Sequence, residues 1–213
     1  MKAVLWDLDG VLVDSIAAHV RAWHLALEEQ GLHTSELSLK RLGALPFKET
    51  VKRVMEENGK EDADYDTLYK RRKELIYSLF AYIKPFPVVN GLLMLKERGV
   101  RNIVVTGSSR EFSEQIVEKF FPDLFDGLVT ADDVANGKPH PDPYLLGLAR
   151  ANISPEECVV VEDAPLGIAS GKAAKITVFA LTTTLPKEEL HNADKIFASH
   201  EDLFTYLIAQ VQK

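Results

Sequence analysis

Two aspartates near the start of the chain, Asp7 and Asp9, have the type and spacing for phosphoryl chemistry. They follow the apolar run 3–6 and precede Gly10. Side chains two residues apart in an extended strand point to the same side, so these carboxylates are expected to lie close together. Their repulsion is tolerated when a divalent cation lies between them or when one carboxyl keeps its proton. The ordinary alternative is a strand followed by an Asp-Gly turn.

Three further segments place polar residues just after an apolar run. The segment Thr106-Gly107-Ser108-Ser109 follows 102–105, Lys138 lies in a Gly/Pro-rich loop after 127–130, and Glu162-Asp163 follows 158–161. Each segment also has an ordinary interpretation: a turn with a helix cap, a solvated lysine, and an acidic helix entry. Their common position after predicted strands favours a single shared site.

Together these residues can hydrolyse a phosphate ester through an aspartyl-phosphate. Asp7 is the candidate nucleophile, and Asp9 would protonate the leaving oxygen and then activate water. Mg²⁺ is the expected cation, since it prefers a few carboxylates together with a phosphate oxygen. Its candidate ligands are Asp7, Asp163, the backbone carbonyl of Asp9 and, directly or through another ligand, Glu162. The groups expected to hold the phosphate oxygens belong to Thr106, Gly107, Ser108 and Lys138.

The elements that must position these groups are short runs rich in Val and Ile. They lie at 3–6, 102–105, 127–130, 158–161, 176–181 and 195–198, and most have helical patterns between them. Such alternation indicates βαβ units and a parallel sheet, whose strands end along one edge. The predicted fold class is therefore α/β, with a Rossmann-like parallel-sheet core.

A long stretch between the first two predicted strands does not alternate. Its apolar spacing predicts helices starting near Ile16 and near Val51, and a longer one from Leu68 to Ile83. We therefore expect a catalytic α/β core of residues 1–14 and 87–213, interrupted by an all-helical cap domain of residues 15–86. A helical insertion at this point is expected to lie over the edge of the sheet where open α/β folds bind ligands.

Composition narrows the classes of partner and location. The chain has 213 residues, of which 46% are hydrophobic, enough to bury a sizeable core. Its formal net charge of -7 argues against a nucleic-acid binder. The single cysteine, Cys158, lies in an apolar run and excludes an intrachain disulfide, as is typical of a reducing compartment. No signal peptide or membrane span is evident, so we expect a cytoplasmic protein that does not bind membranes.

The four motifs, in this order, resemble those of the haloacid dehalogenase superfamily of phosphohydrolases. The similarity extends over nearly the whole chain and rests on Asp7 to Ser15, Val105 to Ser109, Gly137 to Pro143 and Val161 to Ile168. The resemblance implies a nucleophile at Asp7, an acid and base at Asp9, phosphate binding by Thr106 and Lys138, and Mg²⁺ on Asp163 with Glu162. It also implies that the helical segment is a cap that opens to admit substrate, in a protein that is a monomer or homodimer.

Within that superfamily the chain is similar to sugar-phosphate phosphatases, phosphoglycolate phosphatases and β-phosphoglucomutases. The segment His19 to Trp23 resembles a stretch found in the mutases and in some sugar phosphatases. The segment Leu42 to Glu49 departs from the mutase pattern, which places Ser-Arg soon after the glycine; Lys48 would substitute only as a point charge. His19 has the alternative of being an ordinary helix residue, and Lys48, His24 and Arg72 stay unranked as substrate contacts.

The leading hypothesis is a Mg²⁺-dependent phosphatase acting on a small phosphate monoester, a sugar or polyol phosphate. The first alternative is a mutase that moves phosphate within one sugar. The second, from another class, is a phospho-accepting signalling module similar to response-regulator receivers. Receivers carry the phosphorylated aspartate on a later strand and need no cap, so the position of Asp7 argues against them.

Overall fold

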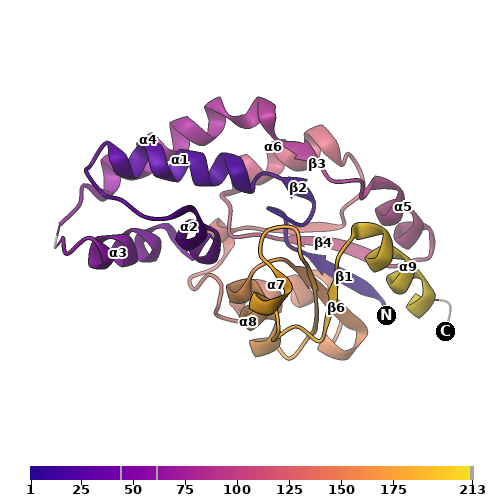
Figure 1. Cartoon of the computed structure of the whole chain (residues 1–213). Helices are drawn as coiled ribbons and strands as arrows, with labels where there is room; N and C mark the ends of the chain where they lie inside the picture. Colours follow the sequence, from indigo (N-terminus) through magenta and orange to yellow (C-terminus); the bar gives the residue numbers. More distant parts are fainter. Residues whose placement is uncertain (44, 61, 212–213) are drawn as a thin grey trace.

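The computed structural model describes residues 1–43, 45–60 and 62–211, and its centre is a six-stranded parallel sheet (Figure 1). In spatial order the strands are β5 (Gly127–Val129), β4 (Arg101–Val105), β1 (Ala3–Trp6), β6 (Cys158–Glu162), β7 (Thr177–Leu181) and β8 (Lys195–Phe197). These are the six apolar runs identified in the sequence. The α/β, Rossmann-like fold class is confirmed.

Strand β1 lies in the middle of the sheet, between β4 and β6. Its residues alternate between two cores: Val4 and Trp6 pack in one hydrophobic cluster, and Ala3 and Leu5 in the other. This alternation follows from the two-residue period of a strand, and burial on both faces explains why the strand reads as an unbroken apolar run. The chain that follows β1 therefore leaves the sheet at its centre.

Helices cover both faces of the sheet. The face of Val4 and Trp6 is covered by α5 (Val89–Glu97), α6 (Arg110–Phe120) and α9 (His200–Val211). The face of Ala3 and Leu5 is covered by α7 (Asp142–Ala151) and α8 (Pro165–Ala173). Among the residues described, no helix combines the length and the apolar character needed to cross a bilayer.

The remaining helices form a separate group beside the sheet (Figure 1). They are α1 (Ile16–Glu28), α2 (Glu36–Leu42), α3 (Phe47–Glu57) and α4 (Tyr65–Ser78). These helices share a hydrophobic cluster of their own, which includes Trp23, Leu39, Val51 and Leu68. The periodicity predicts this helical character but does not single out the short α2, whose two buried residues are Leu39 and Leu42.

The prediction of one long helix from Leu68 to Ile83 is wrong at its end. Helix α4 stops at Ser78, and a 3₁₀ turn, Phe80–Tyr82, follows it. Pro85 accounts for the conformation of Lys84, because a residue before proline is pushed out of the helical region into an extended conformation. Lys84 and Pro85 accordingly form the short strand β3 (Lys84–Pro85).

The two connections between the sheet and the helical group run side by side. Strand β2 (Val13–Asp14) pairs antiparallel with β3, with Val13 opposite Pro85 and Asp14 opposite Lys84. The Phe86 N–H also donates to the carbonyl of Leu12, at 3.0 Å. The chain thus enters and leaves the helical group at one place.

Candidate active site

The last residue of β1, Trp6, is fixed by burial and by a hydrogen bond. Trp6 is fully buried, and its Nε1–H donates to Asn102 Oδ1 at 3.0 Å. The backbone then turns at once: Leu12 N–H donates to the Leu8 carbonyl, and Gly10 has φ +83°, a left-handed conformation that favours glycine. Asp7 and Asp9 therefore lie beyond the strand, in a tight turn.

Because the strand ends at Trp6, the two aspartates lie in a turn rather than in the extended strand that the i, i+2 argument assumes, and both line the same cavity. Asp7 is directed toward a buried lysine: Lys138 Nζ donates to Asp7 Oδ1 at 2.5 Å. Asp9 instead accepts hydrogen bonds from Ser15 and Ser108. Each aspartate thus has its own hydrogen-bond partners, although the charge of Asp9 still raises the pKa of Asp7.

Lys138 is the centre of a buried charged cluster. Its side chain is almost fully buried, and its Nζ also donates to Glu162 Oε1 at 2.6 Å and to the Val105 carbonyl at 3.1 Å. Glu162 receives a further bond from the hydroxyl of Tyr144, at 2.7 Å. Burial lowers the pKa of Lys138, but the adjacent Asp7 and Glu162 carboxylates outweigh it, so the net pKa lies above its ordinary value. Lys138 is therefore a fixed ammonium rather than a solvated side chain.

Three buried carboxylates face this single ammonium: Asp7, Glu162 and Asp163 each offer an oxygen within 4.8 Å of the others. The net pKa of Asp7 is raised to about 8: burial raises it most, Lys138 lowers it, and the charges of Glu162 and Asp9 raise it. Burial and the charges of Asp7 and Glu162 also raise the pKa of Asp163 well above its usual range. More negative charge is gathered here than Lys138 neutralises. This set of hard oxygen donors fits a divalent cation such as Mg²⁺.

Two glycines leave the space that the acidic group needs. A Cβ on Gly10 would collide with the Asp163 carboxylate, and a Cβ on Gly167 would collide with the Glu162 carboxylate. The Asp163 carboxylate also accepts a hydrogen bond from the hydroxyl of Thr184. Asp163 is thus enclosed between the turn after β1 and the loop after β7.

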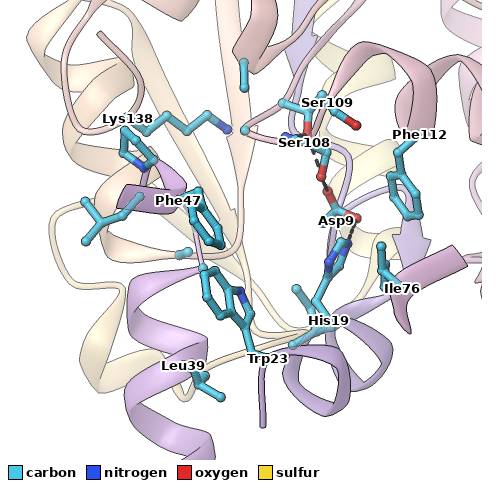
Figure 2. Close-up of a pocket in the computed structure, with 18 of the residues that line it drawn as sticks. Asp9, His19, Trp23, Leu39, Phe47, Ile76, Ser108, Ser109, Phe112 and Lys138 are labelled. Atoms are coloured by element: carbon cyan, nitrogen blue, oxygen red, sulfur yellow. Dashed lines mark hydrogen bonds and ion pairs between the residues drawn. The ribbon is translucent and has the colours of Figure 1, made fainter. Parts of the chain in front are cut away.

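Asp9 is held from two sides (Figure 2). Ser108 Oγ donates to its Oδ2 at 2.7 Å, and His19 Nε2 lies 3.0 Å from its Oδ1. Burial raises the pKa of Asp9, but His19 and the hydroxyls of Ser108 and Ser15 outweigh it, and the net pKa lies well below its ordinary value. Asp9 is therefore ionised in this arrangement.

The segment after β4 forms a compact turn beside Asp9. Thr106 is buried, and its Oγ1 accepts from the Ser108 N–H at 3.0 Å. Helix α6 begins at Arg110 with Ser109 as its N-cap residue, so this segment also starts a helix, as its ordinary interpretation predicts. Backbone N–H groups at such a helix start, together with the hydroxyls of Thr106 and Ser108, can hold phosphate oxygens.

The motif residues and the helical group line one cavity of about 280 Å³. On the helical side its wall combines aromatic rings with the cations Lys40, Arg72 and Lys73. The Trp23 and Phe47 rings stack, with centroids 5.2 Å apart (Figure 2). The Arg72 guanidinium lies over Trp23, with Cζ 4.6 Å from the ring centroid. Arg72 Nε is buried and has no hydrogen-bond partner in the described part of the chain.

The structure brings most of the sequence-predicted site residues to this cavity. Its lining includes Asp7, Asp9, His19, Thr106, Gly107, Ser108, Lys138, Glu162 and Asp163. Lys48 is exposed and does not line the cavity, whereas its neighbour Phe47 does. His24 Nε2 lies 3.1 Å from the Thr34 carbonyl, within the helical group. Ala44, in the segment that departs from the mutase pattern, lies outside the described residues.

Sequence reasoning left Arg72 unranked and missed Thr184, Tyr144 and Ser15. Thr184 carried a usable signal, because it follows β7 just as the other motifs follow their strands. Tyr144 carried none, since it lies within α7 among apolar residues and meets Glu162 only through the packing of α7 against the sheet.

Comparison with known proteins agrees with this geometry. Residues 4–181 match the family model of the haloacid dehalogenase-like hydrolases. The chain is 34% identical to hexitol phosphatase A of Escherichia coli (strain K12), covering 95% of this chain and 93% of the relative. It is 29% identical to β-phosphoglucomutase of Bacillus subtilis (strain 168), with coverage of 82% and 80%.

A solved structure of a Bacteroides vulgatus protein proposed to be a β-phosphoglucomutase superposes with a TM-score of 0.90. It is 30% identical and covers 100% of this chain, which covers 90% of it. The fold, the order of the motifs and these similarities agree, and the chain belongs to the haloacid dehalogenase-like hydrolase family.

Proposed function

We propose that the protein is a Mg²⁺-dependent phosphatase that hydrolyses a sugar or polyol monophosphate. The observation that carries this proposal is the buried group of Asp7, Glu162 and Asp163 around a single ammonium, that of Lys138. A protein gains no stability from crowding three carboxylates in its interior, so their cost points to a function. Phosphoryl transfer needs such an arrangement, because its catalysis consists mainly of positioning and charge neutralisation.

Asp7 is the proposed nucleophile. Its carboxylate attacks phosphorus and forms an aspartyl-phosphate while the bond to the leaving oxygen breaks, and Asp9 gives that oxygen its proton. Asp9 then takes a proton from the water that cleaves the aspartyl-phosphate, which releases inorganic phosphate and restores Asp7. Because its pKa lies well below the ordinary value, Asp9 is ionised in this arrangement, so it must take up a proton before it can give one to the leaving oxygen, and the carboxylate left afterwards accepts the proton of the water.

The residues around these aspartates have complementary roles. The Thr106 and Ser108 hydroxyls, the Gly107 N–H and the Lys138 ammonium hold the phosphate oxygens. The oxygens that would hold Mg²⁺ belong to the side chains of Asp7, Asp163 and Glu162 and to the backbone carbonyl of Asp9. The chemistry that bound Mg²⁺ supplies is neutralisation of the charge on the phosphate oxygens and on Asp7.

We further propose that residues 15–86 act as a cap domain over a core of residues 1–14 and 87–213. The pairing of β2 with β3 supports these boundaries, because both connections pass through it. Cap closure would exclude water from the reacting atoms and place substrate against the cap lining.

The cap lining favours hydrolysis of a monophosphate over a mutase reaction. A mutase must grip a second phosphate, and the candidate residue for this, Lys48, lies outside the cavity. The cations of the helical group that do line the cavity are already in contact with protein groups: Lys40 with Glu36, Arg72 with His19 and Lys73 with Glu111. Aromatic faces suit the C–H surface of a sugar or polyol better than a second dianion. The named activity of hexitol phosphatase A supports the same substrate class. The buried Cys158 supports a reducing, cytoplasmic location.

The test is release of inorganic phosphate from a panel of sugar, polyol and two-carbon phosphates, with Mg²⁺ and with EDTA. Asp7→Asn is expected to lower turnover by about a thousandfold or more. Asp14→Asn, an exposed aspartate on β2, is the matched control and should keep wild-type turnover. Release that persists in EDTA would contradict the metal requirement, and interconversion of β-glucose 1-phosphate and glucose 6-phosphate without release would identify a mutase.

A further inference from the structure

The loop after β7 brings a threonine to the acidic group. Thr184 is half-buried, lines the cavity and donates its hydroxyl to Asp163 Oδ2. A Cβ on Gly10 would collide with both the Asp163 carboxylate and the Thr184 hydroxyl. The carboxylate of Asp163 therefore lies between Gly10 and Thr184, and its Oδ2 accepts a hydrogen bond from the Thr184 hydroxyl.

The position of Thr184 is fixed by its neighbours on both sides. Thr182 N–H donates to the Phe197 carbonyl at 3.1 Å, and Thr183 Oγ1 donates to the Gly10 carbonyl at 2.5 Å. Leu185, the next residue, is 2% exposed and packs in the hydrophobic cluster that contains Ala3 and Leu5. Because Thr182, Thr183 and Leu185 are each fixed by a contact, the hydroxyl of Thr184 between them is held in one place.

We propose that Thr184 is a positioning residue that fixes the Asp163 carboxylate for Mg²⁺. The hydroxyl holds Oδ2 and so fixes the orientation of the carboxylate, which offers an oxygen to the group of Asp7 and Glu162. A charge-assisted hydrogen bond to an anionic ligand orients it and reduces the freedom it loses when it binds a cation. This inference rests on the proposed metal-dependent function and assigns Thr184 a part that it plays through Asp163.

The test is the dissociation constant of Mg²⁺, measured by isothermal titration calorimetry on the intact protein without substrate. Thr184→Val keeps the shape of the side chain and removes the donor, and we expect Mg²⁺ binding to weaken by about 10- to 100-fold. Thr184→Ser keeps the hydroxyl and should stay within about threefold of wild type on the same scale. Thr184→Ala removes the donor without adding a methyl group and should match Thr184→Val, so the comparison survives if the valine variant does not fold.

Thr182→Val is the matched control, because Thr182 holds the loop through its backbone N–H, which valine retains. If Thr184→Val and Thr184→Ala melt at a lower temperature but bind Mg²⁺ as wild type does, the inference is overturned while the phosphatase proposal stands. If the wild-type protein binds no Mg²⁺ and releases phosphate in EDTA, the phosphatase proposal fails in its metal requirement, and this inference fails with it.

Discussion

Asp9 Oδ1 and His19 Nε2 lie 3.0 Å apart, across the boundary between the core and the helical group. Arg72, whose guanidinium has only donors, lies 3.2 Å from His19 Nδ1. Nδ1 must therefore accept, which leaves Nε2 to carry the hydrogen that is donated to Asp9. One imidazole thus connects a buried guanidinium of α4 to the proposed acid and base.

We predict that His19→Ala lowers kcat by about 10- to 100-fold, because Asp9 loses the donor that fixes its Oδ1. His19→Asn offers an amide N–H in its place and should recover part of the loss. Steady-state phosphate release measures both variants. A wild-type kcat in His19→Ala would show that Ser15 and Ser108 are sufficient to hold Asp9.

The second prediction concerns a contact between the helical group and the segment after β7. Arg41 of α2 pairs with Glu189 through Nε–Oε2 at 2.7 Å and NH2–Oε1 at 2.9 Å. Arg41→Glu replaces this attraction by repulsion, which disfavours closure, so KM should rise by about threefold. Arg41→Glu combined with Glu189→Arg should restore KM, whereas two independent, additive losses would show that the residues do not act as a pair.

The third prediction concerns the hydroxyl of Tyr144, which is fully buried against Glu162. Tyr144→Phe should lower the free energy of unfolding by about 1.5–3 kcal/mol, the usual contribution of a buried hydrogen bond to a charged group. Urea denaturation measures it. Tyr65→Phe is the control, because within the described part of the chain the Tyr65 hydroxyl makes only a weak sulfur contact, 3.6 Å from Met55 Sδ, and its loss should cost less than about 0.5 kcal/mol.

The fourth prediction is a pH-dependent stability. Asp133 accepts hydrogen bonds from the N–H and hydroxyl of Thr130, both at 2.8 Å, and from Arg110 and Arg150. Burial raises its pKa, but these donors outweigh it, and the net pKa lies well below the ordinary value. Since the unfolded chain binds the proton more tightly, the stabilisation is complete above about pH 5 and declines as the pH falls below about 4.

Asp133→Asn should therefore lower the free energy of unfolding by about 2 kcal/mol at pH 7. The difference in unfolding free energy between wild type and Asp133→Asn should narrow as the pH falls toward 3, because the ionised Asp133 of the wild type then stabilises the fold less. Urea denaturation at several pH values measures this. An equal difference at every pH would mean that the shape of the residue, and not its charge, stabilises the turn.

The sequence predicted the sheet because buried parallel strands are apolar on both faces, as β1 and β6 are. It predicted the core motifs because each follows a strand, and parallel strands end along one edge. It did not predict which partner each aspartate takes. That depends on the strand ending at Trp6, one residue before Asp7, and element boundaries are the least certain part of a pattern.

The cap side was predictable in type but not in detail. Apolar spacing showed that the segment is helical. Successive side chains of a helix point in different directions, so a small rotation of the helix changes which residue faces the cavity. Phe47 and not Lys48 lines the cavity, and Arg72 does so from a helix far along the chain. Such choices depend on packing between helices, which a single sequence does not report.

The pairing of Val13 with Pro85 has an evolutionary consequence. The two connections to the helical group, β2 and β3, lie next to each other. The group is therefore joined to the rest of the chain in the same way as a domain inserted into a surface loop. A different set of helices, or a short turn from Leu12 to Phe86, could replace it without disturbing the order of the strands. Selection can therefore exchange the part that contacts the organic end of a substrate while leaving the phosphate chemistry unchanged.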